Sequence, residues 1–261
     1  MKSWLLIGDP HAHPEYDNDR FEWLGKCIVD SQPDRILCIG DFADMPSLSS
    51  YDKGKKSFEG RRYRRDIESV IDAQEKMFAP LHKYNEARRR NKERLYRPEF
   101  YMTIGNHEHR INRVTEDSSE LEDVISVKDL MYEEYGWHCT PFMEVLNLDG
   151  WSFSHYFATG VSGRPISGEN IGRTLVNKNL TSSIQGHSHV LDYSMRTTAT
   201  GERMHGMSIG CYTHPDMIEG WNRNTQHMWW TGVVYMNTAD DTGDLLTMST
   251  IKQEVLKELY A

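Results

Sequence analysis

Four short runs along the chain have the length and boundaries of buried β-strands, and each continues into polar residues. The runs cover residues 3–7, 35–39, 100–104 and 182–186. Each stops at a glycine, and Asp, Asn or His residues follow it. Open α/β sheets present their binding sites at the carboxyl ends of strands. The pattern therefore predicts four strands that deliver polar side chains to one site.

The rest of the chain carries further helix and strand signals. Apolar residues recur at helical spacing across residues 21–28, between the first two strands. Residues 145–154 have the pattern of a β-hairpin with a tight turn at Asp149 and Gly150. The order of strand, helix and strand indicates an α/β fold with parallel strands. The other expected elements are an acidic helix at about 118–135, strands at 203–209, 231–237 and 244–250 with a turn at 240–243, and a closing helix at 252–260.

Residues 45–99 form a long, basic connection between the second and third predicted strands. Between residues 51 and 97 there are 15 Lys/Arg against 8 Asp/Glu, a net charge of +7, which leaves −16 for the rest of a chain whose total is −9. Residues 47–65 are expected to be loop. Apolar spacing predicts an amphipathic helix over 67–81 with a kink at Pro80. The basic residues at 88–94 either extend this helix or follow it. We interpret the segment as a partly helical insertion.

Length and composition favour a single α/β domain over residues 1–261. The length also fits two small domains, but we find no linker, repeat or low-complexity tract. The four cysteines show no CxxC spacing, which argues against a zinc ribbon or a redox motif. The first apolar run is too short for a signal peptide or a membrane span. A cytoplasmic protein with reduced thiols, and no membrane partner, is therefore expected.

The polar residues at and beyond the strand ends form a consistent set of metal ligands. Carboxylate, amide and imidazole groups suit Mn²⁺, Zn²⁺, Fe or Ni better than the all-oxygen sites of Mg²⁺ or Ca²⁺. Seven ligands are too many for one ion, but they fit two ions that share a bridging carboxylate. The seven candidates are Asp9, His11, Asp41, Asn106, His155, His187 and His189.

The order of these motifs resembles the calcineurin-like metallophosphoesterase superfamily. Five blocks occur between residues 9 and 189: Asp-x-His, Gly-Asp-x-x-Asp, Gly-Asn-His-Glu, a lone His and Gly-His-x-His. One block alone is weak evidence, whereas all five in order are specific. The resemblance implies a four-layer α/β/β/α sandwich with a dimetal site at the carboxyl ends of the strands. The sequence departs from the family pattern at Tyr156, because the family often has glycine directly after the histidine that corresponds to His155.

The resemblance also implies a role for each candidate residue. The first ion would be bound by Asp9, His11 and His189, the second by Asn106, His155 and His187, and Asp41 would bridge the two. His107 would face the scissile phosphate instead of binding metal, and Asp44 would orient it. The implied cofactor is two divalent ions, with manganese expected and iron, zinc or nickel as alternatives.

The implied reaction is hydrolysis of a phosphate ester by a hydroxide that bridges the two ions. Binding to a metal lowers the pKa of water from 15.7 to about 7, which makes hydroxide available at neutral pH. His107 would protonate or stabilise the leaving oxygen. The nearby His13 and His109 are expected to be solvated or to support the ligands.

The basic insertion is the main clue to the substrate. Protein phosphatases of the superfamily carry Arg at the positions of Met45 and Ile104, so a protein phosphatase is disfavoured. If the basic residues line the cleft, they would attract a polyanion such as nucleic acid. The alternative is a solvated helix face, or pairing with the acidic residues 116–134 of the same or a neighbouring subunit. The candidate substrate-binding residues are Arg61, Arg62, Arg64 and Arg65, with Arg164 and Arg173 as further phosphate clamps.

Three functional hypotheses follow. The first is a phosphodiesterase or nuclease acting on nucleic acid or nucleotides, and the second is a phosphomonoesterase acting on nucleotides or other small phosphates. The third is a non-catalytic metal-binding scaffold, against which the complete ligand set argues. The aromatic residues Trp221, Trp229 and Trp230 are expected to serve core or interface packing rather than base stacking. The sequence makes no prediction of the oligomeric state.

Overall fold

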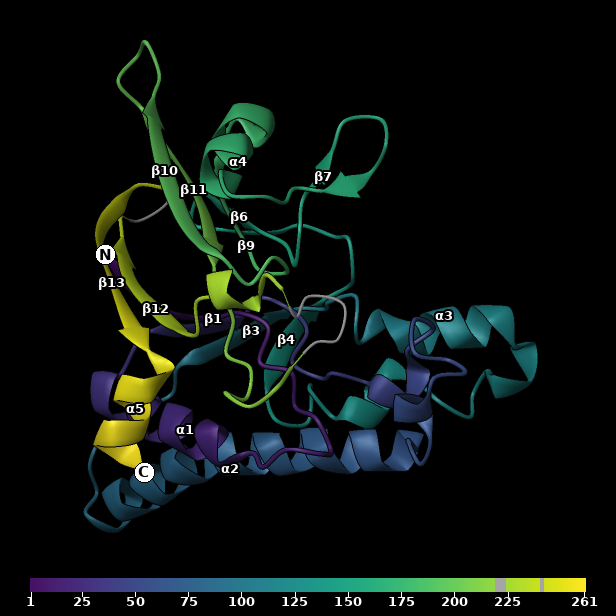
Figure 1. Cartoon of the computed structure of the whole chain (residues 1–261). Helices are drawn as coiled ribbons and strands as arrows, with labels where there is room; N and C mark the ends of the chain where they lie inside the picture. Colours follow the sequence, from purple (N-terminus) through teal and green to yellow (C-terminus); the bar gives the residue numbers. More distant parts are fainter. Residues whose placement is uncertain (219–223, 240–241) are drawn as a thin grey trace.

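A six-stranded sheet lies at the centre of the computed structural model, which describes residues 1–218, 224–239 and 242–261 (Figure 1). Its strands are β1 (Lys2–Ile7), β2 (Arg35–Cys38), β3 (Glu99–Thr103), β4 (Trp137–Thr140), β12 (Gly232–Thr238) and β13 (Leu245–Lys252). Their order is β13-β12-β1-β2-β3-β4. Strands β1 to β4 are parallel to one another, whereas β12 pairs antiparallel with β1 and with β13.

A second, five-stranded sheet packs against the first. It contains β5 (Leu146–Leu148), β6 (Trp151–Phe153), β9 (Ser182–Gln185), β10 (Leu191–Thr197) and β11 (Arg203–Ile209), in the order β10-β11-β9-β6-β5. The inner strand β9 runs parallel to both β6 and β11. A separate two-stranded ribbon pairs β7 (Ala158–Thr159) with β8 (Arg164–Pro165).

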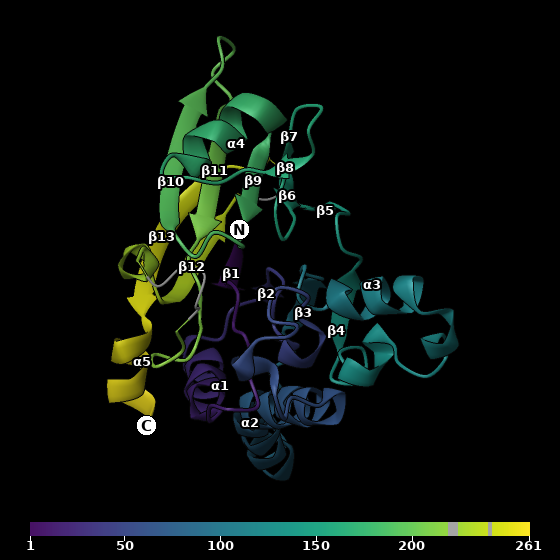
Figure 2. The same cartoon turned by 45° about the vertical axis from the view of Figure 1, so that its right-hand side comes forward.

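Helices cover the outer faces of both sheets (Figures 1 and 2). Helices α1 (Asp19–Ser31), α2 (Tyr63–Arg90) and α5 (Gln253–Tyr260) supply apolar residues to the core on one side of the first sheet. Helix α4 (Ile171–Asn179) packs against β9, β10 and β11 of the second sheet. The chain therefore forms the four α/β/β/α layers that the resemblance implied.

Strand β1 shows why the first apolar run is continuous instead of alternating. Successive side chains of a strand point to opposite faces. Leu5 and Ile7 lie in the core beneath the helices, whereas Trp4 and Leu6 lie in the core between the two sheets. All four side chains are fully buried. A strand covered on both faces must be apolar at every position, as in parallel sheets.

The structure confirms most predicted elements and corrects one helix. The first four strands, the hairpin, and the strands at 203–209, 231–237 and 244–250 are present within a few residues. The acidic helix expected at 118–135 is wrong: α3 (His109–Asp117) precedes it, and the segment holds only short 3-10 turns at Ser119–Leu121 and Val127–Leu130. Its Ser and Asp side chains compete for backbone hydrogen bonds, as Ser126 does by capping the second turn. Part of the turn at 240–243, residues 240–241, lies outside the described residues, as does Trp221.

The basic insertion contains one long helix that extends beyond the predicted apolar span at both ends. Helix α2 begins at Tyr63 and continues past Pro80 to Arg90, so the predicted loop ends earlier than residue 65. Short 3-10 turns at Pro46–Leu48 and Lys56–Phe58 precede it. Its buried face includes Val70, Met77 and Leu81, which pack on the first sheet. In the part of the chain that the structure describes, no helix is both long and apolar enough to span a bilayer.

Candidate metal centre

The predicted ligands come together at the carboxyl ends of strands from both sheets. Each lies in the loop directly after its strand: two after β1, one after β2, one after β3, one after β6 and two after β9. The parallel pairing of β1, β2 and β3 in one sheet, and of β6 and β9 in the other, brings these loops together. Most of the side chains are almost completely buried, at 0 to 6% exposure: Asp9, His11, Asp41, His155 and His189.

Five of the seven candidate ligands have left-handed backbone conformations. Their φ angles lie between 42° and 66°, a region that few non-glycine residues adopt. Such conformations cost free energy and tend to collect at functional sites. The surrounding structure therefore holds these loops in a shape that directs their side chains inward. The five residues are Asp9, His11, Asp41, His187 and His189.

The glycines that end the strands leave room for the aspartates. A Cβ atom at Gly105 would lie 2.1 Å from Oδ1 of Asp41, and one at Gly186 would lie 2.5 Å from Oδ2 of Asp9. Neither carboxylate could move aside without leaving the site. The glycines that end the strands in the sequence thus reflect the close approach of the loops that carry the candidate ligands, rather than turn formation alone.

The first group of candidate ligands is Asp9, His11 and His189. One ligand atom from each lies within 4.8 Å of the others. The Nε2 atom of His189 is 3.8 Å from Oδ1 of Asp9. Two buried nitrogens in this group, Nε2 of His11 and Nδ1 of His189, have no hydrogen-bond partner among the described residues. Buried polar atoms without a partner are costly, so these nitrogens fit a bound cation.

The second group is Asp41, His155 and His187, with Asn106 beside them. The Nε2 atom of His155 lies 2.8 Å from Oδ1 of Asn106, 3.2 Å from Nδ1 of His187 and 3.3 Å from Oδ2 of Asp41. Ligand atoms about 2.1 Å from a shared ion lie roughly 3.0 to 3.4 Å from one another. The Nδ1–H of His155 donates to the carbonyl of Ile39 at 2.9 Å, which leaves Nε2 free to act as a ligand.

Asp41 lies between the two groups. Its Oδ2 is 3.3 Å from His155, in the second group, and 3.9 Å from Nε2 of His11, in the first. Its Oδ1 accepts the backbone N–H of His107 at 2.8 Å. The imidazole of His107 also comes within 3.9 Å of Asp41, so His107 adjoins the cluster as well. The donor set therefore fits two divalent ions with Asp41 between them.

Asp44 links two histidines of the site. Its Oδ1 lies 2.7 Å from Nδ1 of His11 and 3.0 Å from Nδ1 of His107. The backbone carbonyl of Asp44 also lies 2.8 Å from Nδ1 of His107. His13 reaches the other carboxylate oxygen of Asp44, with Nε2 at 3.6 Å. Asp44 thus orients the two rings so that each Nε2 points into the cluster.

The pKa values of the cluster reflect the crowding of charged groups. Burial raises the pKa of Asp9 to about 7, although His155 opposes it. Burial disfavours the charged forms of His11 and His155, but neighbouring carboxylates outweigh it and raise their pKa values to about 9 and about 10. Burial and the adjacent His155 lower the pKa of His187 to about 3. Because their pKa values lie above 7, His11 and His155 hold protons at neutral pH, and divalent cations would replace those protons as counter-charges.

Sequence reasoning assigned no role to Glu108, which supports the metal loops. Its side chain is fully buried. Its carboxylate accepts backbone N–H groups from Asp41 at 3.1 Å, Ala43 at 2.9 Å and Gly105 at 2.9 Å, and the hydroxyl of Tyr132 at 3.0 Å. The only sequence signal was its place in the Gly-Asn-His-Glu block. Its function depends on loops distant in sequence, which no local pattern reveals.

Two aromatic side chains flank the cluster. The ring of Tyr156, the departure from the family pattern, lies 4.8 Å from the ring of His187 and 5.7 Å from that of His155. Trp229 contacts the ring of His189 edge-on at 4.1 Å. Trp229 therefore packs against a candidate ligand, a more specific position than the core or interface packing expected from sequence.

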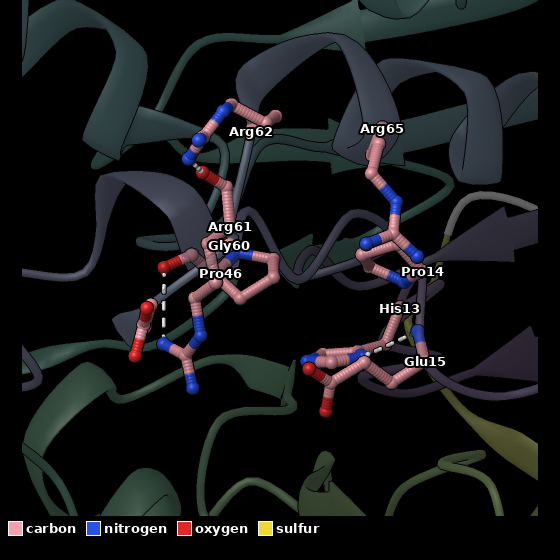
Figure 3. Close-up of a pocket in the computed structure, with 9 residues that line it drawn as sticks. His13, Pro14, Glu15, Pro46, Gly60, Arg61, Arg62 and Arg65 are labelled. Atoms are coloured by element: carbon pink, nitrogen blue, oxygen red, sulfur yellow. Dashed lines mark hydrogen bonds between the residues drawn. The ribbon is translucent and has the colours of Figure 1, made fainter. Parts of the chain in front are cut away.

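The predicted substrate arginines differ in their relation to the site (Figure 3). Arg61, Arg62 and Arg65 line a small pocket together with His13 and the carboxylate residues Glu15 and Glu59. Figure 3 shows the guanidinium of Arg65 beside Pro14 and His13. Arg61 is partly neutralised, because it bonds to Asp52 at 2.8 Å. His13 contacts both this pocket and Asp44, so the pocket adjoins the candidate metal centre.

The other three arginines lie elsewhere. Arg64 is 89% exposed and pairs with Glu68 one turn along α2, and it does not line the pocket. Arg164 is exposed in β8, and Arg173 is exposed on α4, which covers the outer face of the second sheet (Figure 2). Within the candidate set, Arg61, Arg62 and Arg65 thus lie nearest to the cluster through His13, and Arg64, Arg164 and Arg173 do not line this pocket.

Comparison with known proteins agrees with the fold. The family model described as calcineurin-like phosphoesterase matches residues 3–233. A search of curated proteins found no match to this chain. The matched region includes every candidate ligand and both sheets apart from β13 and most of β12. The chain belongs to the calcineurin-like phosphoesterase family.

Proposed function

We propose that this protein is a metal-dependent phosphodiesterase that acts on nucleic acid or nucleotides. The observation that carries the metal-dependent part of the proposal is the position of Asp41 between two groups of buried ligands, at 3.3 Å from His155 and 3.9 Å from His11. The basic pocket beside His13 favours a nucleic-acid or nucleotide diester as the substrate. Manganese is the cation that we expect, since imidazole and carboxylate ligands are mixed. We also propose that residues 1–261 act as one domain with the insertion at about 45–99.

The residues of the chain would share the work of hydrolysis as follows. Two bound ions would supply Lewis-acid activation of water and of the phosphoryl oxygens. The oxygen of water would bond to phosphorus and lose its proton to solvent while the ester P–O bond breaks, and His107 would protonate or stabilise the leaving oxygen. Asp44 keeps His107 in position through Nδ1. The rigid, partly left-handed loops hold the ligands in place before the substrate arrives.

Hydrolysis of bis-p-nitrophenyl phosphate and p-nitrophenyl phosphate, side by side, tests the proposal. We expect activity with added Mn²⁺, loss of activity with a chelator, and preference for the diester. His107→Ala should retain both metals by elemental analysis and lose turnover by roughly 10² to 10⁴. Loss of metal in this variant would instead make His107 a ligand. Preference for the monoester would identify a phosphomonoesterase, and two bound metals without turnover of either ester would favour a scaffold.

Binding of single-stranded oligonucleotides tests the role of the basic insertion. Arg65→Ala should weaken oligonucleotide binding, because it removes a cation beside His13. The matched control is Arg64→Ala, which removes the same charge one residue away on the exposed face of α2. Turnover of the small diester should not change in either variant. Equal losses of oligonucleotide affinity in both variants would show that only the net charge of the helix matters.

A further inference from the structure

Arg110, to which sequence reasoning assigned no role, lies in contact with His107. It lies in the first turn of α3, directly after the Gly-Asn-His-Glu block. Its Nη1 donates to the backbone carbonyls of Asp44 at 2.8 Å and Met45 at 3.3 Å. Its Nη2 lies 2.9 Å from Nε2 of His107. Because a guanidinium is planar, the two carbonyl bonds fix the plane in which Nη2 approaches His107.

The contact with His107 defines which nitrogen of the ring carries the proton. A guanidinium has donors and no acceptor, so Nε2 of His107 must accept this hydrogen bond. The proton then resides on Nδ1, which donates to Asp44. Because Asp44 holds Nδ1, Nε2 is the nitrogen with which His107 would act on the leaving oxygen in the proposed function, and it can take up a proton only when Arg110 has left. In this state Arg110 therefore occupies the position that a substrate oxygen would take.

The charge of Arg110 is not neutralised by a carboxylate. Among the described residues it forms no ion pair within 4.0 Å, although the whole chain carries a net charge of −9. The bonds above leave its Nε–H and one Nη2–H without a described partner. Arginine binds phosphate oxygens through such paired donors more strongly than neutral groups do. A half-buried, unpaired arginine beside the proposed leaving-group residue thus suits an incoming phosphoryl group.

We propose that Arg110 binds the phosphoryl group of the substrate and that this group displaces Arg110 from Nε2 of His107. The inference rests on the proposed function for the identity of the anion. Arg110 would thus be a substrate-binding residue in addition to the metal ligands. Binding of the substrate would also break the hydrogen bond between Arg110 and Nε2 of His107. A purely structural alternative is that Arg110 only anchors α3 to the loop at residues 44–48.

Arg113 offers a matched control for that alternative. It lies one turn further along α3, and its Nη2 donates to the carbonyl of Leu48 at 3.2 Å. Arg113 therefore anchors the same helix to the same loop, and none of its described hydrogen bonds involves His107. Arg113→Gln and Arg110→Gln each remove one positive charge and the hydrogen bonds of one arginine to this loop, two for Arg110 and one for Arg113. Only the second removes the contact with His107.

The test is binding of inorganic phosphate by calorimetry, with and without Mn²⁺, followed by kcat and KM for the small diester. Arg110→Gln should weaken phosphate binding and lower kcat/KM by about 10- to 100-fold, as expected for hydrogen bonds to a charged group. Arg113→Gln should stay within about twofold of the natural protein. Arg110→Lys should recover part of the phosphate affinity, because it restores the charge without the planar donors. Metal content and thermal unfolding midpoint should match in all three variants.

Two results would overturn the proposal. One is unchanged phosphate affinity in Arg110→Gln, and the other is an equal loss in Arg113→Gln. If the proposed function is wrong, the result differs: the unsubstituted protein shows no metal-dependent turnover of the diester. Phosphate binding is measured without turnover, so it still decides whether Arg110 binds the anion.

Discussion

Replacing Asp41 with asparagine is expected to empty both proposed metal sites and to abolish most phosphoesterase activity. Asp41 is 2% exposed, and it is the carboxylate that lies between the two ligand groups. The amide of asparagine can still accept the N–H of His107 through Oδ1, but it loses the charged oxygen that faces His155 and His11. We expect metal affinity to fall by more than about 100-fold, since removal of even an outer partner costs roughly 10- to 100-fold.

Elemental analysis after dialysis against Mn²⁺, together with kcat for the diester, measures this effect. The control is Asp30→Asn, an exposed aspartate on α1 that accepts a hydrogen bond from Tyr260. Asp30→Asn should retain the metal stoichiometry and turnover of the natural protein. Asp41 would not be a bridging ligand if Asp41→Asn bound two metals per chain with undiminished affinity.

Replacing Glu108 with alanine is expected to give the largest loss of stability. The substitution removes the acceptor for three backbone N–H groups, from Asp41, Ala43 and Gly105, in a fully buried position. Each buried donor left unsatisfied costs about 1 to 3 kcal/mol. The total of about 3 to 9 kcal/mol is comparable with the whole free energy of unfolding of a typical domain, about 5 to 15 kcal/mol.

Urea unfolding followed by fluorescence measures the change in the free energy of unfolding. Glu108→Gln should lose less, because its amide oxygen still accepts from part of the set. Glu116→Ala is the matched control, since Glu116 is exposed near the end of α3, and it should change stability by no more than about 0.5 kcal/mol. Equal stability of Glu108→Ala and Glu116→Ala would show that water replaces the lost acceptor.

The family and the layered fold could be predicted from sequence because their signals are local. Buried parallel strands require continuous apolar runs, and the close approach of the ligand loops requires glycine at positions such as Gly105 and Gly186. The helix expected at 118–135 was wrong because this segment lacks a comparably strong local signal. Its charged residues carry little apolar periodicity, so short capped turns compete with a continuous helix.

The sequence by itself determined which residues could serve as metal ligands and the order in which the strands present them. Only the tertiary structure decided how those residues meet: Asp41 lies between the two groups, Asp44 joins two histidine rings, and Arg110 bonds to His107. The phase of α2 likewise decided that Arg65 lines the pocket while Arg64 faces solvent. The physical reason is the distance along the chain over which each interaction acts. Strand and turn preferences act between near neighbours, whereas these contacts join loops that only sheet pairing brings together.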